Sequence, residues 1–395
     1  MEKVLLASNV ASMMQQFNMK NIELLQRAGY EVHIACNFLV GNNITEDVIS
    51  DFLKMCEVQG IKCHQLNILR TLFTPKIKQV YNEIRDIVKN NDFKMIHVHS
   101  PIAGVLTRIA ARKKRRMGTK IIYTAHGFHF FKGAPCLNWL VYYPVEWICS
   151  WITDCIITIN REDFNRAKRH MHARKIEYIP GVGVDIQRFR NTEVDRVEKR
   201  KEIGVPDNAV LLLSVGELNK NKNHETIIRA MSELKDEKIH YAIAGIGPNK
   251  EELLRLAKEL KVEDNFHLLG YRTDICEINK ISDIFCFPSY REGLGLSAIE
   301  AMASGKPIIT SNVHGIWDYS KNGVTGFSIA PTDVEGFKEA IVVLIEDHAL
   351  REKMGENNSA VVDKFSWENV NEEMRRIYEG VLKDEYKGKY SYTGI

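Results

Sequence analysis

Short β-rich runs alternate with helix-length amphipathic segments along almost the whole chain, and this alternation constrains the fold more than any other feature. In the first half the β-rich runs end in polar or glycine residues, and the clearest are 3–8, 30–36, 93–100, 120–127 and 154–160. The pattern then restarts, with runs at 209–216, 239–247, 265–270, 283–289, 306–311 and 326–330. Such alternation is typical of a parallel sheet with crossover helices. The sequence therefore predicts an α/β protein with two doubly wound halves.

A charged stretch with few apolar residues, 191–208, separates the two halves. We expect it to be a linker between a first domain, 1–190, and a second domain, 209–367. A C-terminal helix at about 368–385 is expected to pack back on the first domain. In doubly wound sheets ligands bind at the carboxyl ends of strands, so the functional residues are sought in the loops that follow strands.

The bulk composition indicates a globular protein that does not cross a membrane. Apolar residues make up 45% of the chain and charged residues 27%, and the net charge of +3 gives no sign of nucleic-acid binding. The eight cysteines form no C-x-x-C pair, which is typical of buried thiols in a reducing compartment. The N-terminus lacks signal-peptide features, and Pro144, Glu146 and Asp154 interrupt the most apolar stretch, 136–159. We expect a cytoplasmic protein.

The stretch "REGLGLSAIEAMASGKPII" (291–309) carries two glutamates, Glu292 and Glu300, around a glycine-rich turn. On an unbroken helix this spacing would separate them by about 12 Å and turn them about 80° apart, which excludes a shared small ion. The expected helix, 296–304, would present unpaired N–H groups and a positive dipole end to a diphosphate. An elongated ligand with a sugar, a diphosphate and a ribose would match this arrangement. The simpler alternative is a loop glutamate and an unrelated surface glutamate.

Other strand ends also carry candidate residues. Gly216 ends one strand and is followed by Lys220 and Lys222, which could neutralise a phosphate or be ordinary solvated charges. Gly245 and Gly247 end another strand and could be turn glycines only. His97 and His99 should share one face of a strand, and they lack a third metal ligand in the sequence. His126 ends the next strand and could contact substrate oxygens or be structural.

Several common motifs are missing. The sequence contains no Asp-x-Asp, so the usual metal-dependent way of holding a nucleotide diphosphate is not supported. It also contains no Walker motif and no G-x-S-x-G, and "SNVASM" after the first strand lacks G-x-G-x-x-G, which makes a nicotinamide dehydrogenase unlikely on sequence grounds.

The ordered set of motifs resembles the retaining glycosyltransferases of family 4. The matching segments are "IHVHSP", "TAHGFHF", "IPGVGVDIQRF", "SVGELNKNKNHETIIRAM", "AIAGIGP", "LLGYRTDI", the long segment from "DIFCFPS" to "NGVTGF", and "FSWENV". This resemblance covers nearly the whole chain. It implies the GT-B fold, in which two Rossmann-like doubly wound domains face each other across a cleft. Within the family, the chain is similar to bacterial enzymes that build capsular or exopolysaccharide repeat units on a lipid carrier.

The resemblance also implies roles for particular residues. Glu300 would hold the ribose hydroxyls, and Glu292 would contact the donor sugar near the reacting carbon. Lys222 would bind the diphosphate, and His126 would approach the donor sugar from the first domain. The backbone of Gly293, Leu294, Gly295 and Leu296 would lie along the sugar and diphosphate, and Gly216, Tyr271 and Arg272 would border the donor site, with Tyr271 and Arg272 near the base.

Two departures from the family pattern affect these roles. Glu217 stands where family members often have an arginine that meets the diphosphate. Either Lys220 substitutes for that arginine, or Lys222 and the helix dipole neutralise the phosphates alone. The glycine-rich first loop of the family is replaced here by "SNVASMMQQFNMKN" (8–21), so the acceptor is the least transferable part of the resemblance.

These observations predict a metal-independent glycosyltransferase without a cofactor, whose donor is a nucleotide-sugar, with UDP implied by family habit. No carboxylate is placed as a covalent nucleophile, so we expect front-face substitution with retention, in which the donor phosphate helps to deprotonate the acceptor. The expected acceptor is a lipid-linked glycan. A nucleotide-sugar epimerase of the same architecture and a non-catalytic nucleotide-sugar-binding protein are the alternatives.

Two neighbouring segments of the first half could contact a membrane. The run 108–120 holds seven Lys and Arg and no acid, and 139–151 contains Trp139, Tyr143, Trp147 and Trp151. Because Pro144 starts or kinks a helix, only Trp147 and Trp151 are sure to share a face. The alternative is that these aromatics are core residues. Basic charge beside interfacial aromatics predicts peripheral association with an anionic membrane surface.

Overall fold

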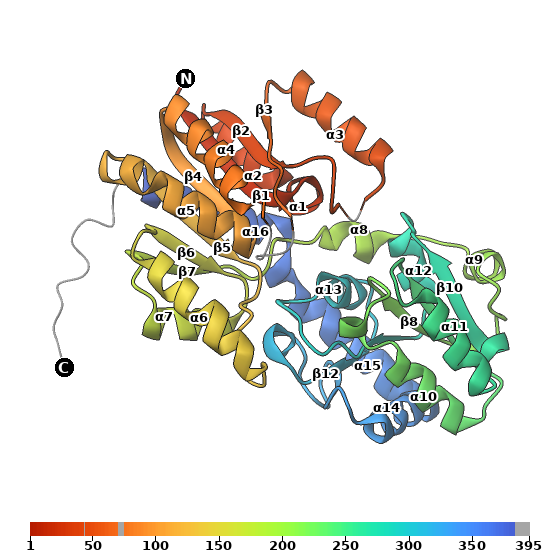
Figure 1. Ribbon diagram of the computed structural model, residues 1–395. Helices are drawn as coiled ribbons and strands as arrows, with labels where there is room; N and C mark the ends of the chain where they lie inside the picture. The colour runs from red at the N-terminus through yellow and green to blue at the C-terminus, as the bar shows by residue number, and fades with distance from the viewer. Residues whose placement is uncertain (43, 70–74, 384–395) are drawn as a thin grey trace. The chain divides into compact units, whose positions relative to one another are not determined.

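The computed structural model describes residues 1–42, 44–69 and 75–383, and it contains two compact units (Figure 1). The first unit comprises Met1–Val182 and the chain from Val370 on, and the second comprises Gly183–Asn369. Each unit has its own parallel sheet, so the two doubly wound halves predicted from the sequence are present.

The sheet of the first unit has the strand order β3-β2-β1-β4-β5-β6-β7, and all of its neighbours are parallel. Its strands are β1 (Lys3–Val10), β2 (Glu31–Asn37), β3 (Lys62–Gln65), β4 (Phe93–His99), β5 (Lys120–Ala125), β6 (Cys155–Thr158) and β7 (Lys175–Tyr178). The chain builds outward from β1 in one direction and then crosses to β4 on its other side. The strand order therefore reverses between β1 and β4, and such a switch point is where ligands bind in open α/β sheets.

The sheet of the second unit is also wholly parallel, with the order β10-β9-β8-β11-β12-β13. Its strands are β8 (Val210–Val215), β9 (Ile239–Ala244), β10 (Phe266–Gly270), β11 (Ile284–Phe287), β12 (Ile308–Ser311) and β13 (Gly326–Ile329). The strand order reverses between β8 and β11. The loops after these two strands therefore occupy the position where a ligand is expected.

All the strands predicted from the sequence are present, but two edge strands of the first sheet are missed. These are β3, with the sequence KCHQ, and β7, with the sequence KIEY. An edge strand is hydrogen-bonded on one side only and is often short, so it can form with little apolar burial. Most of β3 is exposed, and neither strand has the apolar run that reveals a buried strand.

Helices connect the strands in each unit (Figure 1). In the first unit they are α1 (Ala11–Phe17), α2 (Met19–Arg27), α3 (Glu46–Val58), α4 (Ile77–Asn90), α5 (Pro101–Arg116), α6 (Cys136–Ser150) and α7 (Arg161–His170). In the second unit they are α8 (Ile186–Asn191), α9 (Arg196–Glu202), α10 (Glu225–Leu234), α11 (Lys250–Glu259), α12 (Ile275–Ile281), α13 (Leu296–Ala303), α14 (Val334–Glu346) and α15 (His348–Val361). Short 3₁₀ turns are η1 (Lys220–Lys222), η2 (Glu263–Asn265), η3 (His314–Asp318) and η4 (Val362–Phe365).

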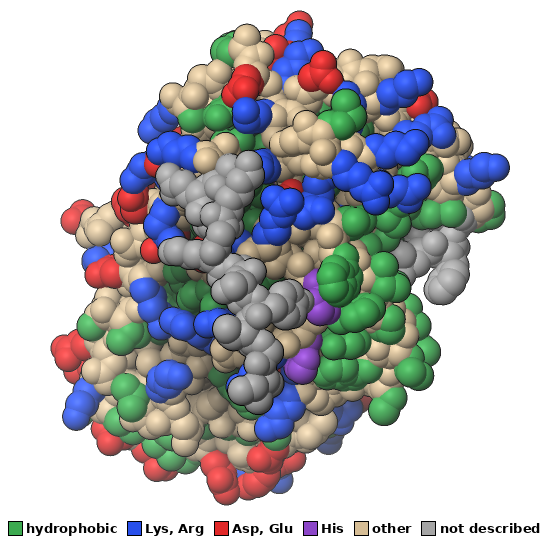
Figure 2. Space-filling view, turned by 90° about the vertical axis from the view of Figure 1, so that its left-hand side faces the viewer, with side chains coloured by type: hydrophobic (Ala, Val, Ile, Leu, Met, Phe, Trp, Pro, Cys, Tyr) green, Lys and Arg blue, Asp and Glu red, His purple; other side chains and the backbone are tan. Residues whose placement is uncertain are grey.

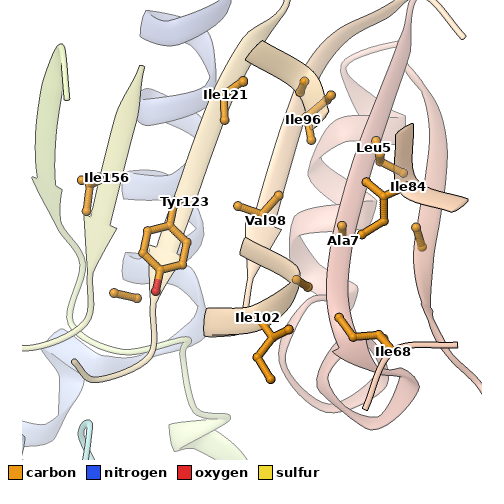
Figure 3. Packing of buried hydrophobic residues seen from close by; sticks show 14 of the residues in the cluster. Leu5, Ala7, Ile68, Ile84, Ile96, Val98, Ile102, Ile121, Tyr123 and Ile156 are labelled. Atoms are coloured by element: carbon orange, nitrogen blue, oxygen red, sulfur yellow. The ribbon is translucent and has the colours of Figure 1, made fainter. Parts of the chain in front are cut away.

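Alternating strand residues build the core of the first unit. Ile96 and Val98 of β4 belong to a buried cluster that includes Ile84 of α4 and Ile102 of α5 (Figure 3). His97 lies between them in sequence and therefore points to the other face of the sheet. The second unit has a separate cluster that joins residues of β8, β9 and β11 to α10, α11 and α14.

The charged stretch 191–208, predicted from its composition to be a linker that could hold a short helix, is folded into the second unit. It contains α9, and the guanidinium of Arg200 is fully buried, where it donates to Asp283 at 2.6 Å and to the carbonyl of Ile281 at 2.9 Å. This stretch lies inside the second unit, which begins at Gly183 rather than near residue 209. Composition could not reveal this, because the charges of this stretch are used in internal hydrogen bonds.

The C-terminal helix α16 (Trp367–Leu382) starts in the second unit and continues into the first from Val370 on. Its Tyr378 hydroxyl lies 2.8 Å from Nδ1 of His97, on the face of the first sheet opposite α4 and α5. The helix expected at 368–385 thus ends at Leu382, and its last two expected residues, 384 and 385, lie outside the described residues.

Candidate active site

Two loops meet at the switch point of the second sheet. The loop after β8 leads through η1, and the loop after β11 leads to α13. Tyr290 donates its backbone N–H to the carbonyl of Asn221 at 2.8 Å, and Nδ2 of Asn221 donates to the carbonyl of Arg291 at 2.9 Å. Because the carboxyl ends of neighbouring parallel strands lie at the same edge, two segments far apart in the sequence form one site.

Lys222 and Glu292 are in direct contact in this site. The Lys222 ammonium donates to Oε1 of Glu292 at 2.6 Å, and it lies 4.8 Å from the centroid of the Phe287 ring. Oδ1 of Asn219 accepts the backbone N–H of Lys222 at 3.0 Å and so closes the short turn that carries the lysine. A charge-assisted hydrogen bond over a ring face holds the ammonium in one place.

Glycines at the site are required by close backbone approach. A Cβ on Gly245, which follows β9, would lie 1.8 Å from the carbonyl oxygen of Gly216, which follows β8. Gly295 has a φ of +88°, and a Cβ there would lie 2.4 Å from the ring of Phe287. The glycines that could have been simple turn residues therefore bring neighbouring loops within contact of each other.

The N-terminus of α13 faces this loop region. Gly295 is the N-cap and supplies no side-chain cap, and the first turn contains no acidic residue. Leu294 is buried, whereas Gly293, Gly295 and Leu296 are partly exposed. The first-turn N–H groups and the helix dipole together provide a site for an anion such as a phosphate.

Glu300 lies in the second turn of α13 and is partly buried. Burial raises the pKa of its carboxyl group to about 7, and the charge of Arg188 on the neighbouring α8 opposes this increase. Glu300 and Glu292 therefore have different environments, because the carboxylate of Glu292 is paired with Lys222. The two carboxyl groups thus have different charged neighbours, Lys222 for Glu292 and Arg188 for Glu300.

Two buried hydroxyl groups near the site have no hydrogen-bond partner among the described residues, Oγ of Ser289 and the hydroxyl of Tyr319. A Cβ on Gly295 would lie 3.0 Å from the Tyr319 hydroxyl, which places this group beside the start of α13. Burial, and then the charge of Glu292, raises the pKa of Tyr319. Sequence reasoning missed both residues. Ser289 carried a usable signal, since it lies in the loop just after β11, which ends at Phe287, whereas Tyr319 carried none.

Other predicted donor-site residues have different surroundings. Lys220 and Glu217 are exposed, and Lys220 lines a pocket of about 250 Å³ with His224, Asn249 and Glu252. Tyr271 is 54% exposed. The guanidinium of Arg272 is paired with Asp274 and Glu202. Lys220 and Arg272 therefore take no part in the ion pair between Lys222 and Glu292.

A histidine cluster lies at the carboxyl ends of β4 and β5 in the first unit. Nε2 of His126 lies 3.1 Å from Nδ1 of His99, and the rings of His97 and His99 are 4.1 Å apart, as their shared face predicts. His97 also contacts the hydroxyl of Thr124 at 2.7 Å. Burial lowers the pKa of His126 to about 4, so its imidazole is neutral at physiological pH. A neutral imidazole in a partly exposed position can donate to or accept from a substrate hydroxyl.

The predicted membrane segments separate into buried and exposed parts. Arg108 is fully buried and donates to Glu146 at 2.7 Å, and its guanidinium lies 4.1 Å from the centroid of the Tyr123 ring. Trp139 and Tyr143 pack against the core of the first unit, as the core alternative predicted. Trp147 and Trp151 share a face with ring centroids 6.2 Å apart, and both are exposed. The sequence could not separate these sets, because aromatic residues occur both where α6 packs on the core and where it is exposed.

Within the described part of the chain, no helix is long and apolar enough to span a membrane. The same residues contain no group of three or more His, Cys, Asp or Glu side chains that could hold a metal ion.

Comparisons with known proteins agree with this geometry. The family described as "Glycosyl transferases group 1" matches residues 195–361, and "Glycosyltransferase Family 4" matches residues 20–188. A protein of Bacillus subtilis named "Putative glycosyltransferase EpsD" is 33% identical over 392 residues, which is 98% of this chain and 99% of that protein. An Escherichia coli protein named "UDP-Gal:alpha-D-GlcNAc-diphosphoundecaprenol alpha-1,3-galactosyltransferase" is 26% identical over 89% of each chain.

Solved structures show the same fold. The Anabaena protein Alr3699/HepE, solved in complex with UDP and glucose, superposes with a TM-score of 0.78 at 18% identity, covering 96% of this chain and all of that one. WaaG, described as a glycosyltransferase involved in lipopolysaccharide biosynthesis, gives a TM-score of 0.74 at 18% identity over 95% of this chain. The predicted GT-B class, with two Rossmann-like units, is confirmed. Two family models match most of the chain, and a relative is 33% identical along nearly the full length of both proteins. The chain therefore belongs to glycosyltransferase family 4 and is a glycosyltransferase.

Proposed function

We propose that this protein is a retaining glycosyltransferase that moves a sugar from a UDP-sugar to a lipid-linked acceptor in cell-surface polysaccharide synthesis. The observation that carries the proposal is the convergence of Lys222, Glu292 and the start of α13 at the switch point of the second sheet, with Glu300 one turn further on. A cation and a helix N-terminus suit a diphosphate, and two separate carboxylates suit the hydroxyls at either end of a nucleotide-sugar. The solved structures of Alr3699/HepE in complex with UDP and with UDP-glucose support the choice of nucleotide.

The position of Lys220 favours one of the two ways to neutralise the diphosphate. Lys220 lines a separate pocket, and Glu217 is exposed, whereas Lys222 is held at the start of the site. We therefore assign the phosphates to Lys222 and to the N–H groups of Gly293, Leu294, Gly295 and Leu296. The donor would separate Lys222 from Glu292, which frees the carboxylate for the sugar.

The proposed chemistry is a front-face substitution. The bond from the anomeric carbon to the diphosphate oxygen breaks while the acceptor oxygen bonds to the same face, and the acceptor proton passes to an oxygen of the leaving phosphate. Lys222 and the α13 N–H groups stabilise the charge that develops on the leaving group. In the first unit, His126 is the residue proposed to contact substrate oxygens. We further propose that turnover needs no metal ion or cofactor, so it should persist in EDTA.

A donor screen with the purified protein tests the proposal, with nucleotide release measured with and without a lipid-linked acceptor. Lys222→Ala should lower turnover by about 100- to 1,000-fold, as expected for loss of a charge that stabilises the leaving group. Lys220→Ala is the matched control, and it should change turnover by about threefold or less because exposed charges interact weakly. Glu292→Ala should mainly lower turnover.

Three outcomes would contradict parts of the proposal. Equal and small effects of Glu292→Ala and Glu300→Ala would refute the site. A product with inverted anomeric configuration, read by NMR, would refute front-face retention. Release of an altered free nucleotide-sugar without any acceptor would indicate an epimerase.

Peripheral association with the inner face of the cell membrane is also proposed, and the exposed face of α6 supports it. One stripe of this helix spans about 80° around the helix axis and consists of Leu137, Leu140, Pro144, Ile148 and Trp151. Leu140 is 74% exposed and Ile148 is 60% exposed, so this stripe is an apolar surface. Figure 2 shows one face of the molecule on which hydrophobic side chains gather in a band beside Lys, Arg and His side chains.

Binding to anionic vesicles measures this association directly. Leu140→Asp should lower the fraction of protein that sediments with vesicles by about tenfold, because it places a charge in the apolar stripe. The control is Val58→Asp, which changes an exposed apolar residue on α3 and should leave sedimentation unchanged. Failure of the unmodified protein to bind the vesicles would refute membrane association and would leave the glycosyltransferase activity unaffected.

A further inference from the structure

A groove of about 510 Å³ lies between α6 and α7 in the first unit, and the transfer reaction proposed above assigns it no role. Its apolar side is formed by Trp139 and Tyr143 of α6, and its polar side by Glu162, Arg166, Arg169 and His170 of α7. The volume lies within the range of about 300–1,000 Å³ that is usual for small-molecule sites. A few polar groups that converge over aromatic walls are typical of such sites.

Arg166 is a fixed part of the groove wall. It donates to the carbonyl of Phe130 at 2.6 Å and to Oε1 of Glu162 at 3.0 Å, and its guanidinium lies 4.8 Å from the centroid of the Trp139 ring. The backbone N–H of Lys132 also donates to Glu162 at 2.7 Å. Oε1 of Glu162 is therefore paired with Arg166 and Lys132, while its buried Oε2 has no hydrogen-bond partner among the described residues.

Arg169 and His170 differ from Arg166 because their side chains are exposed and form no ion pair or side-chain hydrogen bond with any residue of the described ranges. With Glu162 and Arg166 cancelling each other, Arg169 leaves the groove with a net positive charge. The charge and the available donors of the groove are thus complementary to a phosphate.

The groove borders the apolar stripe of α6. Leu140 follows Trp139 in sequence and Pro144 follows Tyr143, and each step turns the chain about 100° around the same helix. One edge of the groove therefore continues into the surface that we propose to face the bilayer. On the other side of α6, the last turn of α5 adds the exposed cations Arg112, Lys113 and Arg116.

We propose that the α6–α7 groove binds the phosphate of an anionic phospholipid head group, with Arg169 and His170 as its ligands and Trp139 and Tyr143 as its apolar wall. The acyl chains stay in the bilayer, against the stripe of α6. This inference rests on the proposed membrane association, and it adds a specific lipid site to what would otherwise be general attraction between a basic surface and an anionic membrane.

The test compares two cations of the same helix. Vesicle binding is measured with phosphatidylcholine alone and with added phosphatidylglycerol, at constant ionic strength, for the unmodified protein, Arg169→Gln and Lys168→Gln. Lys168 is exposed but does not line the groove, so it is the matched control. Arg169→Gln should weaken binding to phosphatidylglycerol vesicles by about 10- to 100-fold, as expected for a charged hydrogen bond. Lys168→Gln should weaken it by about fivefold or less, as expected for one general surface cation.

Each outcome has a defined meaning. Equal losses of vesicle binding in Arg169→Gln and Lys168→Gln would overturn the head-group site while leaving membrane association in place. A loss of vesicle binding in Leu140→Asp, with no loss in Arg169→Gln, would have the same meaning. Preferential binding to phosphatidylcholine vesicles that carry a polyprenyl diphosphate would assign the groove to the acceptor lipid and overturn the phospholipid assignment. Saturable binding of inorganic phosphate with no effect of the vesicle lipid would show a free-anion site instead.

A second measurement keeps the test independent of folding and sedimentation. Dihexanoyl phosphatidylglycerol should shift the indole NMR signal of Trp139, identified with Trp139→Phe, and dihexanoyl phosphatidylcholine should not. Arg169→Gln should abolish this shift while nucleotide release with a detergent-solubilised acceptor stays unchanged. An unchanged Trp139 signal in the unmodified protein would overturn the proposal.

Discussion

At the scale of single residues, the two glutamates of the α13 region lie in different electrostatic surroundings. Glu292 is paired with Lys222 at 2.6 Å, whereas Glu300 lies partly buried with a pKa raised to about 7. A buried carboxylate without a close cation costs free energy when it is charged. A charged Glu300 therefore destabilises the ligand-free fold, and in the function proposed above it would stabilise the donor complex.

Glu300→Gln should therefore change stability and donor binding in opposite directions. The native pKa lies above the unfolded value, so the stabilising contribution is present below about pH 4.5 and is lost as the pH rises through 7. The substitution should raise the free energy of unfolding by about 1–2 kcal/mol at pH 8 and leave it nearly unchanged at pH 4.5. At pH 8 it should raise the KM for the donor by about tenfold, because a charged acceptor of the ribose hydroxyls is lost.

Thermal unfolding at the two pH values and donor titration at pH 8 measure these effects. Glu292→Gln serves as the comparison, since Glu292 is already paired with a cation and its replacement should not stabilise the fold. A decrease in stability in Glu300→Gln at pH 8 would contradict the assignment.

At the scale of elements, glycines decide how closely the loops of the site approach each other. Gly245 ends one strand and leaves no room for a side chain against the carbonyl of Gly216, and Gly315 does the same against Gly293, with an ideal Cβ 1.9 Å from that carbonyl oxygen. The sequence showed glycines at strand ends, but their roles depend on neighbouring strands that are distant in sequence.

Gly245→Ala should displace the loop after β8 and lower the melting temperature by about 6 °C or more, corresponding to about 3 kcal/mol for overpacked backbone. The control is Gly323→Ala. Gly323 also lies in the second unit, with a φ of +75° and nothing within 4 Å of an added Cβ, so it should cost only about 2–4 °C. Similar losses in both variants would show that backbone conformation, and not the close approach, is what requires the glycine. Donor affinity should fall in Gly245→Ala only.

At the scale of the whole molecule, buried histidines couple stability to pH in both units. Burial lowers the pKa of His97 to about 3, of His126 to about 4, of His224 to about 3 and of His267 to about 4. Each native pKa lies below the value of about 6.5 expected in the unfolded chain, so the unfolded state binds more protons as the pH falls. The stability that these groups contribute is fully present above pH 6.5 and is lost toward their native pKa values.

The free energy of unfolding should therefore fall between pH 6.5 and 5, by up to about 1.4 kcal/mol per pH unit for each histidine. The melting temperature should fall steeply over the same range. Glu300 contributes with the opposite sign in this window, so the slope corresponds to about one proton fewer than these histidines alone would give. His267→Gln should reduce the slope by one proton, and the exposed His348→Gln is the matched control. A melting temperature that does not change over this range would contradict the neutral, buried state of these side chains.

The two parallel sheets could be predicted from the amino-acid pattern, because buried strands need continuous apolar runs and the chain supplies them at regular intervals. It also indicated Lys222, Glu292 and Glu300, because they follow strands that such sheets place at a ligand-binding edge. Which charged side chains form internal hydrogen bonds became visible only in the folded chain. Arg108 and Arg200 look like surface cations in the sequence, yet both are buried and bonded, whereas Arg169 and the stripe of α6 are exposed. The periodicity of apolar residues is a local property, so it predicts strands and helices. The hydrogen-bond partner of a charged side chain lies in a segment that is distant in sequence and comes near only when the chain folds.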